Sequence, residues 1–204
     1  MASDDHYYTI EKAAEGTFRD KGSRFIGYAY PIDAEAEIKD ILGDLRASHP
    51  KARHFCWAYR LGPDKNVYRL NDDGEPGGSA GRPILNTILS AGLTNIFVVV
   101  VRYFGGTLLG VPGLINAYKT ATTEALNNSI TVERTINDVY QLSFSYSSTN
   151  SVMKIIKEEH LKILDQRFDM ESELRVEIPQ GRASGILARL NDISGVVSTY
   201  VKTN

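Results

Sequence analysis

Residues 71–118 read NDDGEPGGSAGRPILNTILSAGLTNIFVVVVRYFGGTLLGVPGLINAY, and two glycine-rich segments in this stretch enclose the most apolar run of the chain. The first segment, 72–82, places three carboxylates ahead of a run of small residues, and the second, 102–112, contains three glycines. Glycine loses more backbone entropy on folding than any other residue, so repeated glycines indicate positive φ angles or close backbone approach. A loop between a strand and a helix also directs free N–H groups toward a bound group. We therefore expect the functional site at these two segments.

The residues between and after these segments predict buried strands and short helices. The β-branched run 95–101 is typical of a strand that is covered on both faces. Pro83 and Pro112 each stand near the start of an expected helix, where proline is tolerated. The second of these helices is expected to end at about residue 128.

Upstream of residue 71, the patterns predict strands around one helix. Alternating apolar and polar residues indicate strands within 7–31, at 54–61 and at 66–72. Apolar residues at three-to-four spacing indicate a helix over 33–50, with Asp33 expected as its N-cap and Pro50 ending it.

A polar stretch, 127–138, interrupts these patterns, and we place a domain boundary there. The N-terminal domain would comprise residues 1–135 and the C-terminal domain residues 136–204. The C-terminal residues predict a strand, a helix, two strands at 161–170 and 172–179, a second helix and a last strand. That β-α-β-β-α-β order is the ferredoxin-like order, and the whole chain is expected to be an α+β protein.

Charge and composition exclude several classes of protein. The net charge is −2, and residues 1–135 hold 15 Lys and Arg against 16 Asp and Glu, so nucleic acid would have to be held by a local patch. Cys56, the single cysteine, excludes an internal disulfide and a multi-cysteine zinc site, and we expect it to be buried. The longest apolar run, 96–101, is too short to cross a bilayer, and no signal-peptide pattern is present, so no membrane partner and a cytoplasmic location are expected.

Three familiar motifs match only in part. Residues 77–81 form G-x-S-x-G, but Gly74-Glu75-Pro76 precedes them and breaks the strand that a nucleophile elbow needs. The span from Gly105 to Gly110 has P-loop spacing but lacks the lysine and hydroxyl residues that follow it. The strand at 172–179 carries no aromatic residue, which excludes base stacking of the RNA-recognition-motif type.

Two interpretations of the acidic segment remain open. Asp72, Asp73 and Glu75 have the oxygen ligands that Mg²⁺ prefers, or they belong to a solvated turn. Arg82 and Arg102 stand near the segment ends and would pair with these carboxylates or with a phosphate. His54 is the histidine nearest the segments, and a structural hydrogen bond is favoured for it over catalysis.

The two segments resemble the signature of the IMPACT/YigZ family, through DDGEPGGSAGRPIL at 72–85 and VVVVRYFGGTLLGVPGLINAY at 98–118, with similar elements at 21–27 and 54–61. The resemblance covers essentially the whole chain. It implies an N-terminal domain like domain 2 of ribosomal protein S5 and a ferredoxin-like C-terminal domain like domain V of elongation factor G. It also implies a nucleic-acid or ribosome partner. The resemblance also implies that eukaryotic relatives carry a further N-terminal module. We do not expect that module here, so their role in dampening a translation-factor kinase is not expected of this chain.

The chain departs from the family pattern in the second segment. Leu108 stands where the family usually has a lysine, and Asn116 stands where an arginine often occurs. Pro112-Gly113 also replaces a common glycine pair. Because each phosphate contact adds about −0.9 to the salt slope on duplex DNA, we predict weaker and less salt-sensitive binding than in typical relatives.

We expect a non-enzymatic cytosolic factor that binds RNA or the ribosome, requires no cofactor and modulates translation. The residues expected to bind nucleic acid or another anion are Lys21, Arg24, His54, Arg82, Arg102, Tyr103, Gly105, Gly106 and Lys119, with Phe104 as a further stacking group. The alternative is a small enzyme or ligand-binding protein in which Asp72, Asp73 and Glu75 hold Mg²⁺ beneath an anion. A third hypothesis is a protein-interaction module.

Overall fold

The computed structural model describes residues 5–167 and 171–203, which form two compact units. The larger unit comprises residues 7–134, and the smaller one residues 135–203 with residues 5–6. The strands of the larger unit are β1 (His6–Ile10), β2 (Ala14–Asp20), β3 (Ser23–Pro31), β4 (His54–Leu61), β5 (Val67–Asn71), β6 (Ile96–Tyr103) and β7 (Thr131–Thr135). Its helices are α1 (Glu37–Ser48), α2 (Gly81–Ser90) and α3 (Gly110–Asn127).

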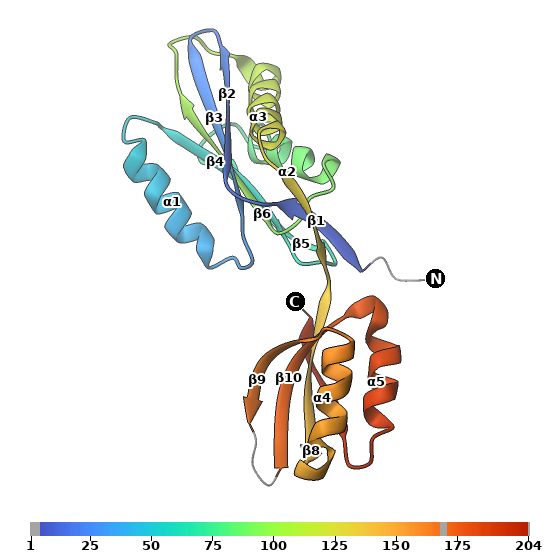
Figure 1. Ribbon diagram of the computed structural model, residues 1–204. Helices are drawn as coiled ribbons and strands as arrows, with labels where there is room; N and C mark the ends of the chain where they lie inside the picture. The colour runs from blue at the N-terminus through green and yellow to red at the C-terminus, as the bar shows by residue number, and fades with distance from the viewer. Residues whose placement is uncertain (1–4, 168–170, 204) are drawn as a thin grey trace. The chain divides into compact units, whose positions relative to one another are not determined.

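A five-stranded antiparallel sheet with the order β2-β3-β6-β4-β5 organises the larger unit, and β1 pairs with β7 in a separate two-stranded sheet. The central strand β6 is buried on both faces, as its apolar sequence predicts. Its side chains at 96, 98 and 100 pack in the core formed with α2 and α3, and those at 97, 99 and 101 pack in the core formed with α1. Figure 1 shows α1 on one face of the sheet and α2 and α3 on the other.

Two local predictions in this unit are wrong. Asp33 is not the N-cap of α1, because the helix begins at Glu37 after Ala36. The Glu37 carboxylate instead accepts hydrogen bonds from the backbone N–H groups of Asp33 and Ala34, at 2.8 and 2.9 Å. Strand β6 also continues through Tyr103, so Arg102 is a strand residue whose position is fixed by pairing with β3 and β4.

The smaller unit contains β8 (Asn137–Ser145), β9 (Lys162–Arg167), β10 (Glu171–Pro179) and β11 (Val197–Thr203) with α4 (Thr149–Glu158) and α5 (Ala183–Asn191). Its antiparallel sheet has the order β11-β8-β10-β9, which is the ferredoxin-like topology predicted from the sequence. The pairing register skips Leu164 in β9 and Val201 in β11, so each edge strand has a bulge. Residues 168–170, the end of the predicted strand 161–170, lie outside the described residues.

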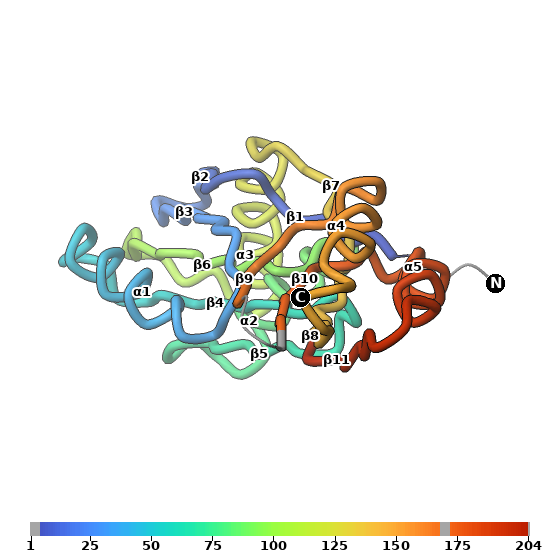
Figure 2. Tube along the Cα trace, turned by 60° about the horizontal axis from the view of Figure 1, so that its bottom comes forward, coloured from blue at the N-terminus to red at the C-terminus, as the bar shows by residue number. Residues whose placement is uncertain are grey.

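Helix α3 lies against the backbone of β2 and β3, which run side by side in both views (Figure 1 and Figure 2). Two glycines allow this approach: a Cβ atom on Gly16 would lie 2.3 Å from the Ala125 nitrogen, and one on Gly27 would lie 2.4 Å from the Ala121 oxygen. At 18 residues α3 is long, yet no helix within the described ranges combines the length and apolar character needed to cross a bilayer.

Substitution of Gly27 by alanine is expected to destabilise the larger unit by about 1–3 kcal/mol, because the new methyl group must push α3 away from the sheet. Gly43→Ala is the matched control: it lies in α1 with no atom within 4 Å of the added Cβ, and alanine favours a helix by about 1 kcal/mol. Urea unfolding followed by fluorescence of Trp57, the single tryptophan, measures both changes. Equal effects of the two substitutions would contradict the close approach.

Candidate functional site

The first glycine-rich loop, 72–80, is closed by the Asp72 side chain. One carboxylate oxygen of Asp72 accepts hydrogen bonds from the N–H groups of Ala80 and Gly81, at 3.0 and 2.8 Å, and the other accepts from Gly78 at 2.9 Å. A carboxylate at a helix N-terminus satisfies N–H groups that have no partner within the helix. The Asp72 carboxylate therefore occupies the N–H groups of α2 that the sequence suggested for an anion.

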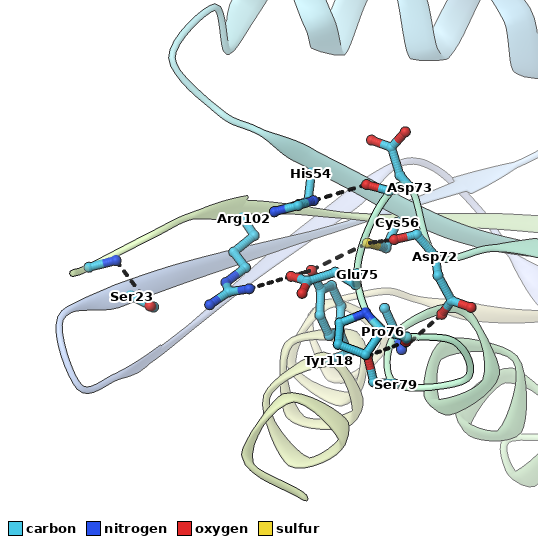
Figure 3. A network of polar contacts seen from close by, with 12 residues as sticks. Ser23, His54, Cys56, Asp72, Asp73, Glu75, Pro76, Ser79, Arg102 and Tyr118 are labelled. Carbon is cyan, nitrogen blue, oxygen red and sulfur yellow. Dashed lines mark hydrogen bonds and ion pairs between the residues drawn. The ribbon is translucent and has the colours of Figure 1, made fainter. Parts of the chain in front are cut away.

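A buried ion pair joins this loop to β6. Arg102 Nη1 donates to Glu75 Oε1 at 2.5 Å, and the two side chains are only 6% and 3% exposed. The Tyr118 hydroxyl of α3 donates to the same oxygen at 2.7 Å (Figure 3). The Arg102 guanidinium also lies 5.4 Å from the centre of the Phe25 ring, although its Nε has no hydrogen-bond partner within the described ranges. Of the two pairings considered for Arg102, the structure shows the one with a carboxylate.

Cys56 and Tyr118 complete the network, and no local sequence pattern pointed to Tyr118. Cys56 Sγ lies 3.0 Å from the carbonyl oxygen of Asp72 and 3.3 Å from the Tyr118 hydroxyl oxygen. Burial raises the pKa of the Cys56 thiol, and the nearby carboxylates raise it further. Burial also raises the pKa of Tyr118. Both groups therefore remain protonated at neutral pH, and Cys56 is buried as the sequence suggested.

His54 has a structural hydrogen bond. Its Nδ1 lies 2.9 Å from the backbone oxygen of Asp73, and because a carbonyl only accepts, Nδ1 must carry the proton. The Asp73 carboxylate accepts from the backbone N–H of Phe55 at 2.7 Å and lies 3.4 Å from Arg46. These contacts fasten the first loop to β4.

The three carboxylates of the acidic segment do not converge. Asp72 binds backbone N–H groups of α2, Asp73 binds β4 and α1, and Glu75 binds Arg102 and Tyr118. Within residues 5–167 and 171–203, no group of three or more His, Cys, Asp or Glu side chains is arranged to hold a metal ion. The arrangement therefore gives the magnesium alternative no support.

The second glycine-rich loop, 104–109, is open, unlike the first. The Gly105 N–H donates to Ser23 Oγ at 3.1 Å, and a Cβ atom on Gly105 would overlap the Gly22 backbone, so the loop lies directly on the turn between β2 and β3. Residues 104–108 are exposed, and Leu108 is 82% exposed. No hydrogen bond to a described residue is present for the N–H groups of residues 106–109, which precede α3. This loop offers free N–H groups at the start of an 18-residue helix.

Two of the predicted cations lie at this loop. Lys21 is part of the β2–β3 turn on which Gly105 packs, and Arg24 pairs in register with Tyr103 across β3 and β6. Both side chains belong to exposed residues, and neither forms an ion pair within the described part of the chain. Lys21, Arg24, Gly105 and Gly106 are therefore brought together, and we call them with residues 107–109 the turn–loop surface.

Tyr103 is held in a chain of hydrogen bonds rather than left free. Its hydroxyl lies 2.8 Å from His49 Nδ1, and His49 Nε2 lies 2.9 Å from the Tyr28 hydroxyl. The sequence patterns did not point to Tyr28 or His49, although the alternation in β3 places Tyr28 on the same face as Arg24. Phe104, which is 49% exposed, is the aromatic ring of the loop that is open to a partner.

Arg82 and Lys119 lie at a different place, in a groove between α2 and α3 of about 610 Å³. The groove and the turn–loop surface share no residue. The predicted set of binding residues therefore divides into the turn–loop surface, this groove, and the buried or half-buried residues Arg102, Tyr103 and His54.

Comparison with known proteins places the chain in a family. The model of the Impact N-terminal domain matches residues 21–126. IMPACT family member YigZ of Escherichia coli is 35% identical over 176 residues, which cover 85% of this chain and 86% of that protein. The chain belongs to the IMPACT family. The member YvyE of Bacillus subtilis is 34% identical over 84% of this chain and 80% of its own length.

A solved structure resembles the chain over nearly its whole length. The crystal structure of a hypothetical protein superposes with a TM-score of 0.78 at 30% identity and covers 97% of this chain and 98% of its own. The family resemblance stated from the segments 72–85 and 98–118 is therefore confirmed. In the IMPACT family member described here, both segments contribute to the buried network, and the second also provides the loop of the turn–loop surface.

Removal of the Glu75 charge by Glu75→Gln is expected to destabilise the larger unit by about 3–5 kcal/mol, because Arg102 is left buried without a counter-ion. Glu35→Gln is the matched control, since the Glu35–Arg69 pair is exposed and is expected to contribute about 1 kcal/mol or less. Urea unfolding followed by Trp57 fluorescence compares the two variants. A loss of stability in Glu75→Gln no larger than in Glu35→Gln would show that the buried pair does not hold the first loop.

Proposed function

We propose that this IMPACT family member is a non-enzymatic, translation-related factor that binds RNA, on the ribosome or free, through the turn–loop surface. The observation that carries the proposal is the packing of Gly105 on the β2–β3 turn. This packing places Lys21 and Arg24 next to the exposed loop 104–109. The family resemblance described from the sequence supplies the expected class of partner.

The chemistry of the surface suits a phosphate backbone. Lys21 and Arg24 supply two cations that pair with no described carboxylate. The loop supplies N–H groups ahead of α3 that are free of bonds to the described residues. Backbone N–H groups at a helix start bind phosphate without sequence preference, and cations add an attraction that salt weakens. Phe104 adds an exposed ring on which an unpaired base can stack.

A small local surface is also consistent with the net charge of the chain. With a net charge of −2, the chain does not attract RNA through its overall field, so binding depends on a small number of contacts. Two cations and one loop predict modest affinity.

The double variant Lys21→Gln with Arg24→Gln is expected to reduce RNA binding and to flatten the dependence of log affinity on log salt by about 0.7 for each lost contact with single-stranded RNA. Co-sedimentation with ribosomes over a salt series, together with binding to a labelled RNA oligonucleotide, measures both quantities. Lys12→Gln with Lys39→Gln is the control, because it removes two exposed charges elsewhere on the same unit. The proposal fails if the two double variants lose the same affinity, or if the parent chain sediments with neither target.

The reverse experiment adds charge to the loop. Leu108→Lys with Asn116→Arg restores residues that the family pattern commonly has, and both positions are exposed. Each new phosphate contact should steepen the salt slope by about 0.9 on a duplex target. Asn66→Lys, in the turn between β4 and β5, controls for added charge. An unchanged salt slope in the double variant would show that positions 108 and 116 do not contact the nucleic acid.

A further inference from the structure

The groove between α2 and α3 is built from two facing rows of side chains. One row belongs to the first loop, α2 and the residue after it, and the other to α3. The lining residues are Gly78, Arg82, Pro83, Asn86, Thr87, Ser90, Ala91, Ile115, Lys119, Thr123, Leu126 and Asn127. A volume of about 610 Å³ lies within the range of small-molecule sites, which is about 300–1,000 Å³.

The charge in the groove has one sign. Among the described residues that line the groove, Arg82 and Lys119 are the only charged ones, and none is a carboxylate. Within the described residues neither cation has an ion-pair partner. An arginine fork beside a lysine attracts a phosphate group in particular, since the guanidinium can donate two parallel hydrogen bonds.

The rest of the groove suits an aliphatic body. Pro83, Ala91, Ile115 and Leu126 provide apolar surface, and no aromatic ring from residues 5–167 or 171–203 lines the groove. Stacking of a nucleobase is therefore not favoured there. The remaining groups are hydroxyls and amides, which add neutral hydrogen-bonding positions such as Asn86 and Thr123.

The buried network fixes both cation-bearing segments. Asp72 binds the N–H groups of Ala80 and Gly81, directly before Arg82. Tyr118, the neighbour of Lys119 in α3, donates to Glu75 in the same loop. The start of α2 and the middle of α3 are thus tied to one loop, so the two cations are carried on rigid elements.

We propose that this groove binds a small organic phosphate with an aliphatic body, with Arg82 and Lys119 at the phosphate and Ile115 and Leu126 along the body. The site is separate from the turn–loop surface and does not depend on the RNA contact. A nucleic acid would contact only the two cations through its phosphates. The apolar lining of the groove suits a ligand that has an apolar part in addition to its phosphate.

Isothermal titration of the full chain with octyl phosphate below its micelle concentration tests the site. Saturable one-to-one binding is expected. Inorganic phosphate lacks the aliphatic chain and octan-1-ol lacks the phosphate, so each should bind at least about tenfold more weakly. Arg82→Gln and Lys119→Gln should each weaken octyl phosphate binding about tenfold, because each removes a charged hydrogen-bond donor. Lys39→Gln, on α1, should leave it unchanged.

A second variant tests the shape of the groove independently of its charged residues. Thr123→Trp places a large side chain in the groove without changing the charge, and it should abolish octyl phosphate binding while Lys21→Gln with Arg24→Gln leaves it intact. Circular dichroism and Trp57 fluorescence of the charge variants confirm folding. The proposal is overturned if octyl phosphate does not bind, if Arg82→Gln and Lys119→Gln bind it as the parent does, or if inorganic phosphate binds equally well.

Discussion

The buried contact of Glu75 with Arg102 and Tyr118 fixes the most unusual part of this chain. Both side chains of this ion pair are less than a tenth exposed, so the two charges lose much of their solvation. The Coulomb attraction between them offsets that cost only when the geometry is good and further hydrogen bonds are present. The Tyr118 hydroxyl supplies such a bond, and the Phe25 ring lies against the guanidinium. A glycine-rich loop, β6 and α3 are therefore joined at one carboxylate oxygen.

The two glycine-rich loops use the same residue type for opposite purposes. In the first, glycines allow the chain to curl around Asp72, and the backbone N–H groups bind that carboxylate. In the second, Gly105 allows contact with the β2–β3 turn, and the N–H groups of residues 106–109 bond to no residue that the structure describes. Glycine content alone does not distinguish a loop that binds itself from one that can bind another molecule.

Much of the architecture was predictable because the spacing of apolar residues along the chain reflects which side chains are buried. The alternation of residues in the ferredoxin-like unit and the continuous apolar run of β6 predicted their sheets correctly, and the segments 72–85 and 98–118 identified the family. The site was less predictable because it depends on long-range contacts. No local pattern indicates that Arg102 would meet Glu75, that Tyr118 would join them, or that Arg82 and Lys119 would line a common groove. The predicted N-cap of α1 was wrong for a local reason, since the Glu37 carboxylate in the first turn binds the N–H groups of Asp33 and Ala34.

The bulges at Leu164 and Val201 affect how the smaller unit meets other chains. Both lie in the outermost strands of its sheet, where unpaired N–H and C=O groups would otherwise form a regular row along each margin. An extra residue kinks the strand and disturbs the even spacing that an incoming strand needs for a ladder. Leu164 and Val201 are also partly exposed apolar residues, at 41% and 43%. Each bulge therefore makes its edge strand a poorer template for a strand of another chain.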